Sequence, residues 1–166
     1  MKTLIVGLGN PILTDDGIGI YVVRELAQCS LPEHVTVTEA SVGGIRLLEI
    51  IAGYDQVILV DAIQTPDSRP GDVYRLTAGD LRATLHSGSS HDLSLPGALN
   101  WGRSIGIKLP DAAAISIIAV EAQDVLTFGE QCTSAVAAAI PRAVEMVLAE
   151  LDRSPTKAPS RTGETR

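Results

Sequence analysis

Short apolar runs alternate with longer amphipathic segments along this chain of 166 residues, and that alternation restricts the possible folds more than any other feature. Strands separated by helices pair in parallel, so the pattern predicts an α/β protein. We expect a three-layer sandwich whose five-stranded, mostly parallel, twisted sheet has helices on both faces. Aromatic residues make up only 3% of the chain, so the core must consist mainly of Val, Ile, Leu and Ala. The expected strands are 2–8, 35–39, 56–61, 72–76 and 114–120, of which 72–76 can run antiparallel at an edge.

Four segments have the periodicity of helices. The second directs Ile45, Leu48 and either Ile51 or Ala52 inward, and Gly53 follows it as a stop signal. Pro141 lies within the last segment and is expected to kink or restart that helix. The segments are the one that carries Ile18, Val22 and Leu26 on one face, and the ranges 43–53, 92–105 and 130–151.

Residues 1–151 are expected to form one domain, whereas 152–166 have almost no apolar residues and are expected to be a disordered tail. No stretch approaches the ~20 apolar residues of a membrane span, and no secretory signal is visible, so we expect a cytoplasmic protein. A net charge of −7 argues against a nucleic-acid partner, because such proteins depend on Lys and Arg to neutralise phosphates.

The amino-terminal stretch places Gly7 and Gly9 after a strand and two acids, Asp15 and Asp16, where a helix is expected to begin. A strand, a glycine turn and a helix often form a phosphate site, but Ile12 stands where a dinucleotide fingerprint requires its third glycine. No Gly-Lys-Ser/Thr follows either, and two carboxylates would repel a phosphate. The phosphate interpretation therefore fails.

Helix capping explains one of these acids. Thr14 can serve as the N-cap, and an acid in the first turn complements the helix macrodipole by ~0.3–1 kcal/mol. Successive helical residues point about 100° apart, so Asp15 and Asp16 cannot share one role. We therefore expect Asp15 to support the fold and Asp16 to be functional.

Two further residues are expected at the same edge of the sheet. Asp61 ends an apolar strand, and open α/β sheets bind ligands beyond the carboxyl ends of their strands. His91 lies in the polar loop HSGSSHD before a possible helix. Each has an ordinary alternative, namely an Asp that bonds turn amides and a surface histidine. Together with Asp16, they suit a divalent ion such as Ni²⁺ or Zn²⁺ with open coordination positions.

These motifs resemble the hydrogenase maturation protease family from residue 1 to about 151. The resemblance rests on G-x-G-N-x-x-x-x-D-[DE]-G at 7–17, on Asp61-Ala62 at a strand end, and on the His91 loop. It implies an endopeptidase that removes the C-terminal peptide from a nickel-loaded precursor of a [NiFe]-hydrogenase large subunit. The catalytic and metal-contacting residues that it implies are Asp16, Asp61 and His91.

The resemblance also implies that Ni²⁺ enters with the substrate, so that the free protein holds metal weakly or not at all. Cd²⁺ or Zn²⁺ can substitute for it. The water that cuts the peptide bond can be activated by the metal or by a carboxylate, and both routes stay open. The precursor is then the expected partner of a monomer that binds neither nucleic acid nor membrane.

One segment departs from the family pattern. Many members carry Asp-Gly-Gly-Thr after the second strand, where it is implicated in choosing the substrate. Here the place reads Glu39-Ala-Ser-Val-Gly43-Gly44, which keeps the acid but moves the glycines. We expect Glu39, Gly43 and Gly44 to contact the substrate, because glycines let a backbone approach closely. The change suggests a different partner, such as a soluble cofactor-reducing hydrogenase.

Two other functions stay open from the sequence. LIVGLGNP at 4–11 also resembles the start of peptidyl-tRNA hydrolases, but no His precedes His34, whereas those enzymes carry a catalytic His near residue 20. The same three ligands could instead deliver or sense nickel in a maturation chaperone without peptidase activity. Cleavage of a precursor separates that alternative from the protease.

Overall fold

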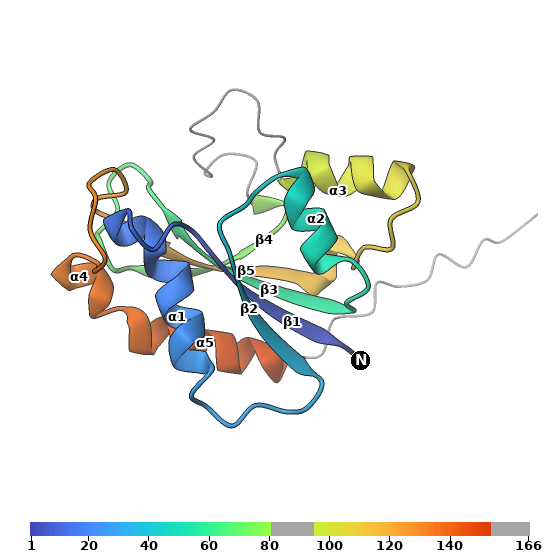
Figure 1. Ribbon diagram of the computed structural model, residues 1–166, viewed down its shortest axis with the longest axis horizontal. Helices are drawn as coiled ribbons and strands as arrows, with labels where there is room; N and C mark the ends of the chain where they lie inside the picture. The colour runs from blue at the N-terminus through green and yellow to red at the C-terminus, as the bar shows by residue number, and fades with distance from the viewer. Residues whose placement is uncertain (81–94, 154–166) are drawn as a thin grey trace, which may run out of the picture.

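Five strands form one sheet in the computed structural model, which describes residues 1–80 and 95–153 (Figure 1). The sheet order is β2-β1-β3-β5-β4; the first four strands are parallel and β4 is antiparallel at the edge. The predicted strands and the antiparallel edge are therefore confirmed. The strands are β1 (Thr3–Leu8), β2 (Val35–Ala40), β3 (Gln56–Ile63), β4 (Val73–Thr77) and β5 (Ile115–Glu121).

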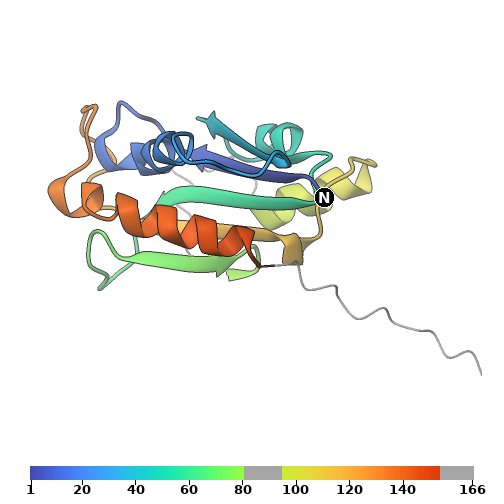
Figure 2. The same cartoon turned by 90° about the horizontal axis from the view of Figure 1, so that it is seen from below.

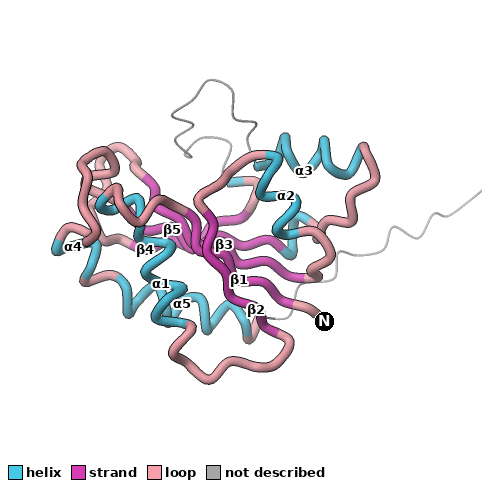
Figure 3. The backbone as a smooth tube through the Cα atoms, in the orientation of Figure 1, coloured by secondary structure: helices cyan, strands magenta, loops and turns pink. Residues whose placement is uncertain are grey.

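Helices cover both faces of the sheet, as Figures 1 and 2 show from two directions and Figure 3 shows along the backbone. Helices α1 (Ile18–Leu26) and α5 (Ile140–Leu151) pack on one face. Helices α2 (Ile45–Ile51) and α3 (Leu95–Ser104) pack on the other. This arrangement is the three-layer α/β sandwich that the alternation of apolar runs predicted.

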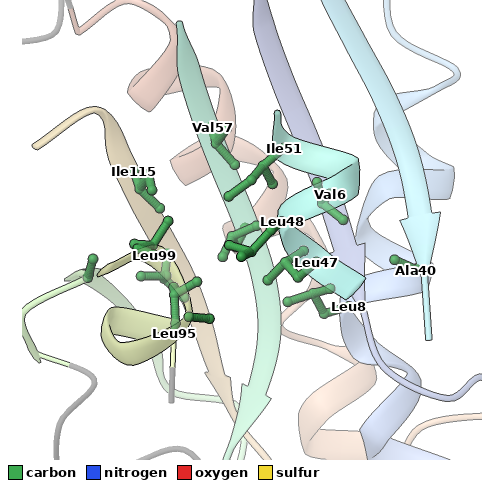
Figure 4. Close-up of a cluster of buried hydrophobic side chains, with 14 of the residues drawn as sticks. Val6, Leu8, Ala40, Leu47, Leu48, Ile51, Val57, Leu95, Leu99 and Ile115 are labelled. Carbon is green, nitrogen blue, oxygen red and sulfur yellow. The ribbon is translucent and has the colours of Figure 1, made fainter. Parts of the chain in front are cut away.

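Alternate residues of the central strands serve opposite layers of the core. Leu4 and Val6 of β1 belong to the cluster beneath α2 and α3, whereas Ile5 belongs to the cluster beneath α1 and α5. Figure 4 shows the first cluster, in which Leu48 of α2 and Leu99 of α3 lie against the sheet. Because β1, β3 and β5 are covered on both faces, their sequences are nearly continuous apolar runs rather than alternating ones.

The inward face of α2 differs from the prediction at one position. Leu47, Leu48 and Ile51 are buried, but Ile45 is 47% exposed. At 100° per residue, Ile45 lies about 110° from the middle of that buried stripe, on its flank and in the first turn. The stop signal is confirmed, since Gly53 has φ +82° just beyond the helix.

The last helical segment restarts at its proline, as expected. A short α4 (Ser134–Ala137) precedes α5, in which Pro141 is the second residue. Proline is tolerated there because the first turn of a helix leaves its N–H groups unpaired in any case. Two 3₁₀ turns complete the described elements, η1 (Thr14–Gly17) and η3 (Ala112–Ala114).

Two expectations concern residues that the structure does not describe in full. Residues 154–166, most of the expected tail, lie outside the described residues. Within the described ranges, every helix is too short or too polar to cross a membrane.

Glycines near β1 allow close packing rather than phosphate binding. Gly9 has φ +134°, and a Cβ there would overlap with the carbonyl oxygen of Asp16. A Cβ on Gly19 would overlap with the carbonyl oxygens of Leu8 and Val60. The start of α1 therefore rests directly on the backbones of β1 and β3, which fixes the chain that carries Asp16 against the sheet.

This contact makes a prediction for Gly19→Ala. Alanine favours a helix interior over glycine by about 1 kcal/mol, but here overlap with two carbonyls should lower the free energy of unfolding by about 1–3 kcal/mol. Urea unfolding of the purified variant measures it. Gly43→Ala is the control, since a Cβ there would meet nothing within 4 Å. A Gly19→Ala variant as stable as the wild type would contradict the packing account.

Candidate functional site

The two carboxylates expected to be functional lie at the carboxyl ends of neighbouring parallel strands. Asp16 belongs to η1, which follows β1, and Asp61 lies in β3. β1 and β3 pair with Gly7 beside Val60, so the chain leaves β1 next to Asp61. The strand continues beyond Asp61 to Ile63, so Asp61 does not end it as the sequence suggested.

Asp16 is half-buried, and its side chain is oriented by the loop after β1. Its Oδ2 accepts a hydrogen bond from the backbone N–H of Asn10 at 2.9 Å. Burial raises the pKa of Asp16, and the hydrogen bond from Asn10 opposes this with a smaller effect. The carboxylate is thus fixed in direction but poorly solvated.

Asp61 is the more perturbed of the two. Part of the residue reaches solvent, but its carboxyl group is enclosed by protein atoms, and this burial raises the pKa of Asp61 to about 7. A hydrogen bond from Ala62 N to Oδ1 at 2.8 Å lowers the pKa, whereas the charge of Asp16 raises it further. The two carboxylates are therefore close enough to repel each other, and a divalent cation between them would relieve that repulsion.

His91 lies outside the described residues, in the segment 81–94 between β4 and α3. The structure therefore brings together Asp16 and Asp61 of the predicted set and leaves the third member a prediction. Over the residues that are described, no group of three or more His, Cys, Asp or Glu side chains could hold a metal ion. The two carboxylates need a further ligand to make a metal site.

Asp15 supports the fold, as predicted, but by a different contact. It is fully buried, and its carboxylate accepts hydrogen bonds from the backbone N–H groups of Gln123, Asp124 and Thr133 at 2.7–2.9 Å. The Thr133 hydroxyl also donates to it, at 2.9 and 3.0 Å to its two oxygens. Asp15 thus joins η1 to the loop that follows β5, rather than stabilising its own helix start.

Thr14 is not the N-cap that the sequence suggested. Leu13 occupies that position for η1, Gly17 occupies it for α1, and neither makes a side-chain capping bond. The Thr14 hydroxyl instead donates to the carbonyl oxygen of Thr127 at 2.5 Å, and its backbone has φ +51°. Thr14 bonds to Thr127 rather than capping a helix because η1 lies against that distant loop.

The residues expected to contact substrate lie on and after β2. Glu39 forms a two-pronged ion pair with Arg24 of α1, at 2.7 and 3.1 Å, and both side chains are about half exposed. The Arg24 hydrogen bonds lower the pKa of Glu39. Gly43 is exposed with open space around it, and Gly44 has φ +57° at the start of α2, a conformation that favours glycine.

Sequence reasoning missed a buried acid at the end of a strand. Glu121 ends β5 and is buried; its Oε1 accepts from Thr65 N at 2.6 Å and its Oε2 from the Thr65 hydroxyl at 2.9 Å. This fixes the turn after β3, just beyond Asp61. Its signal was the one that singled out Asp61, an acid that closes an apolar run.

The fold and the carboxylate pair define an α/β protein with a polar site at the carboxyl edge of its sheet, and comparison with known proteins gives the family. The sequence model of the hydrogenase maturation protease family matches residues 20–150. The chain belongs to that family and is therefore an endopeptidase, a hydrolase. This match sets aside the peptidyl-tRNA hydrolase alternative.

Individual relatives cover nearly the whole chain. The hydrogenase 2 maturation protease of Escherichia coli is 31% identical over 160 residues, which are 95% of each chain. Among solved structures, the hydrogenase maturating endopeptidase HybD from E. coli superposes with a TM-score of 0.76 at 31% identity, covering 91% of this chain and 92% of that one. A hydrogenase 2 maturation peptidase from a Thaumarchaeota archaeon gives 0.66 at 29% identity, covering 92% and 99%.

The Asp15 contacts predict that Asp15→Asn unfolds more easily. The side-chain NH₂ of asparagine would face backbone N–H groups of the loop after β5, which are donors too. The free energy of unfolding should therefore fall by about 2–4 kcal/mol. Urea unfolding at neutral pH measures the change. Asp16→Asn is the matched control and should change stability little, because Asp16 accepts one backbone hydrogen bond and is only half-buried. Equal stability of the two variants would contradict the division of roles.

Asp61→Asn should stabilise the free protein, and more so at high pH. Folding raises the pKa of Asp61 from 3.8 to about 7. The stability that the protonated Asp61 contributes is therefore fully present below pH 3.8, the pKa in the unfolded chain, and is lost as pH rises through 7. Asparagine removes that titration, so the variant should gain about 1–3 kcal/mol at about pH 8 and much less at about pH 4. Urea unfolding at both pH values, with Glu49→Gln as an exposed control, tests this. A gain that does not depend on pH would contradict it.

Proposed function

We propose that this protein removes the C-terminal peptide from a nickel-loaded precursor of a [NiFe]-hydrogenase large subunit, as a monomer in the cytoplasm. The observation that carries the proposal is the pair of poorly solvated carboxylates, Asp16 and Asp61, at the carboxyl edge of the sheet. Its relatives are maturation proteases of hydrogenases, which supports this substrate class.

The proposed metal ligands are Asp16, Asp61 and His91. A Ni²⁺ ion that arrives with the precursor would offset the repulsion between the two carboxylates, and an imidazole with carboxylates suits a borderline ion. In the free protein the same repulsion is partly relieved by a proton on Asp61, whose pKa is about 7. Metal must displace that proton, which favours weak binding in the absence of substrate. Cd²⁺ or Zn²⁺ would bind to the same ligands.

Two routes lead to the attacking water. In the first, a metal ion held by Asp16, Asp61 and His91 would lower the pKa of a water molecule and polarise the scissile carbonyl. Alternatively, Asp61 with a pKa of about 7 can take a proton from water at neutral pH and return it to the departing amine. In both routes Asp16, oriented by Asn10, serves as a fixed anionic ligand.

We propose that specificity for the precursor depends on Glu39, Gly43 and Gly44. The Glu39 carboxylate already binds Arg24, so a basic group on the substrate must share or replace that partner. The open space at Gly43 leaves room for a substrate backbone beside the first turn of α2. The departure from Asp-Gly-Gly-Thr points to a soluble cofactor-reducing hydrogenase as the source of the precursor.

Processing of a purified, nickel-loaded precursor tests the proposal, read as the shift of the large subunit on a denaturing gel. Asp16→Ala, Asp61→Asn and His91→Ala should each slow cleavage by roughly 100-fold or more, because each removes a ligand or proton acceptor. Glu49→Gln, on the exposed face of α2, is the control.

Two results would contradict the proposal in different ways. Normal processing by Asp16→Ala would refute the site assignment but leave the enzyme a protease. A wild-type protein that binds the nickel-loaded precursor without cutting it would instead favour the maturation chaperone.

A further inference from the structure

An exposed apolar patch beside the carboxylates is explained neither by the fold nor by the proposed chemistry. Leu126 and Phe128 are 83% and 80% exposed, and Ile12 is 46% exposed. Phe128 is the only phenylalanine in the chain. Transfer of large apolar side chains out of water lowers the free energy, so a cluster of them left at the surface indicates a surface that binds another molecule. Ile12, Leu126 and Phe128 are called the apolar patch below.

The loop that carries Leu126 and Phe128 is fixed by a turn of its own. The carboxylate of Asp124 accepts hydrogen bonds from the N–H groups of Leu126 and Thr127, at 3.0 and 2.9 Å. The carbonyl oxygen of Thr127 accepts from the Thr14 hydroxyl at 2.5 Å. With its backbone held in this way, the loop presents its two apolar side chains to solvent rather than to the protein's own core.

The same loop is joined to the loop after β1, where Ile12 lies. Gly129 N donates to the carbonyl of Ile12, and Thr14 N donates to the carbonyl of Gly129, both at 3.0 Å. Leu13 and Gly129 form a parallel bridge. The two loops lie side by side in both views of the ribbon (Figures 1 and 2). The apolar patch is therefore carried by two loops that are distant in sequence but joined through their backbones.

The apolar patch adjoins the candidate metal site. Ile12 precedes Asp16 by four residues, which even fully extended span at most about 14 Å. A standard interface buries about 800 Å² per partner, equivalent to a disc of about 16 Å radius. An interface of that size centred on Asp16 would therefore reach the loop of Ile12.

We propose that the apolar patch docks the folded body of the hydrogenase precursor, apart from the segment that is cut; this rests on the function proposed above. The charged residues of 122–133 are Asp124 and Glu130, both acidic. The matching face of the precursor is therefore apolar with basic residues at its border. Docking there holds the precursor so that its metal reaches Asp16 and Asp61.

Kinetics of precursor processing test this inference with the double variant Leu126→Ser/Phe128→Ser. The expected result is a KM for the nickel-loaded precursor raised by about tenfold or more, as for loss of central interface anchors. Ile105→Ser is the matched control, because Ile105 is also apolar and 55% exposed. Ile105 lies near Lys108, whose carbonyl oxygen accepts a hydrogen bond from Gly53 N. Gly53 precedes β3, so Ile105 lies at the edge of the sheet opposite to the carboxylates.

An unchanged KM in the double variant overturns the inference, and so does an equal rise in Ile105→Ser. The wild type must cut the precursor in this assay, and its failure to do so would count against the proposed function rather than against docking. Sedimentation of the wild type adds one more outcome. A dimer that the double variant dissociates would assign the apolar patch to self-association and overturn the inference.

Hydroxyl-radical footprinting of the wild-type protein decides the question without a variant and without cleavage. Millisecond exposure with excess precursor should protect Phe128 and Leu126 from oxidation, while the reactivity of Ile105 stays the same. Equal oxidation of Phe128 with and without precursor would overturn the inference, whether or not the precursor is cut.

Discussion

The carboxylate of Asp15 is the interaction on which the functional edge of this protein depends. It is buried, and it accepts hydrogen bonds from Gln123, Asp124 and Thr133, residues 108 to 118 positions away in the chain. It thereby fixes the loop after β5 to the turn after β1. Asp16 and the apolar patch belong to these two joined segments, so this attachment holds them at the same edge of the sheet. Glycines at 9 and 19 complete it by letting the turn rest on the sheet.

Asp15 and Asp16 are adjacent in the sequence but have different roles. Asp15 has its charge compensated by amides and a hydroxyl, and so contributes to stability. The carboxylates of Asp16 and Asp61 lie near each other and are poorly solvated. The raised pKa of Asp61 reflects the free-energy cost of ionising it there. The fold tolerates this because its other contacts hold both segments in position. Under the proposed function, a cation carried by the substrate would offset the repulsion between the two carboxylates.

Local patterns in the sequence predicted most of the fold and part of the site. The apolar runs located all five strands, and Pro141 located the restart before α5, since both depend on neighbours along the chain. The helix face of Ile45 and the N-cap role of Thr14 were wrong, because tertiary packing and a bond to Thr127 decided them. The anchoring of Asp15 by the β5 loop has no local signature. The pairing of Glu39 with Arg24 across α1 and β2 has none either.

Anomalous diffraction from crystals soaked in Ni²⁺ or Cd²⁺ tests the central claim most directly, because it needs no knowledge of the precursor. The account predicts one ion at the carboxyl edge of the sheet, bound by Asp16, Asp61 and His91. Because binding to the free protein is expected to be weak, the soak uses a metal concentration high enough to fill weak sites. Crystals that then hold an ion only at other side chains, with none between Asp16 and Asp61, would contradict it.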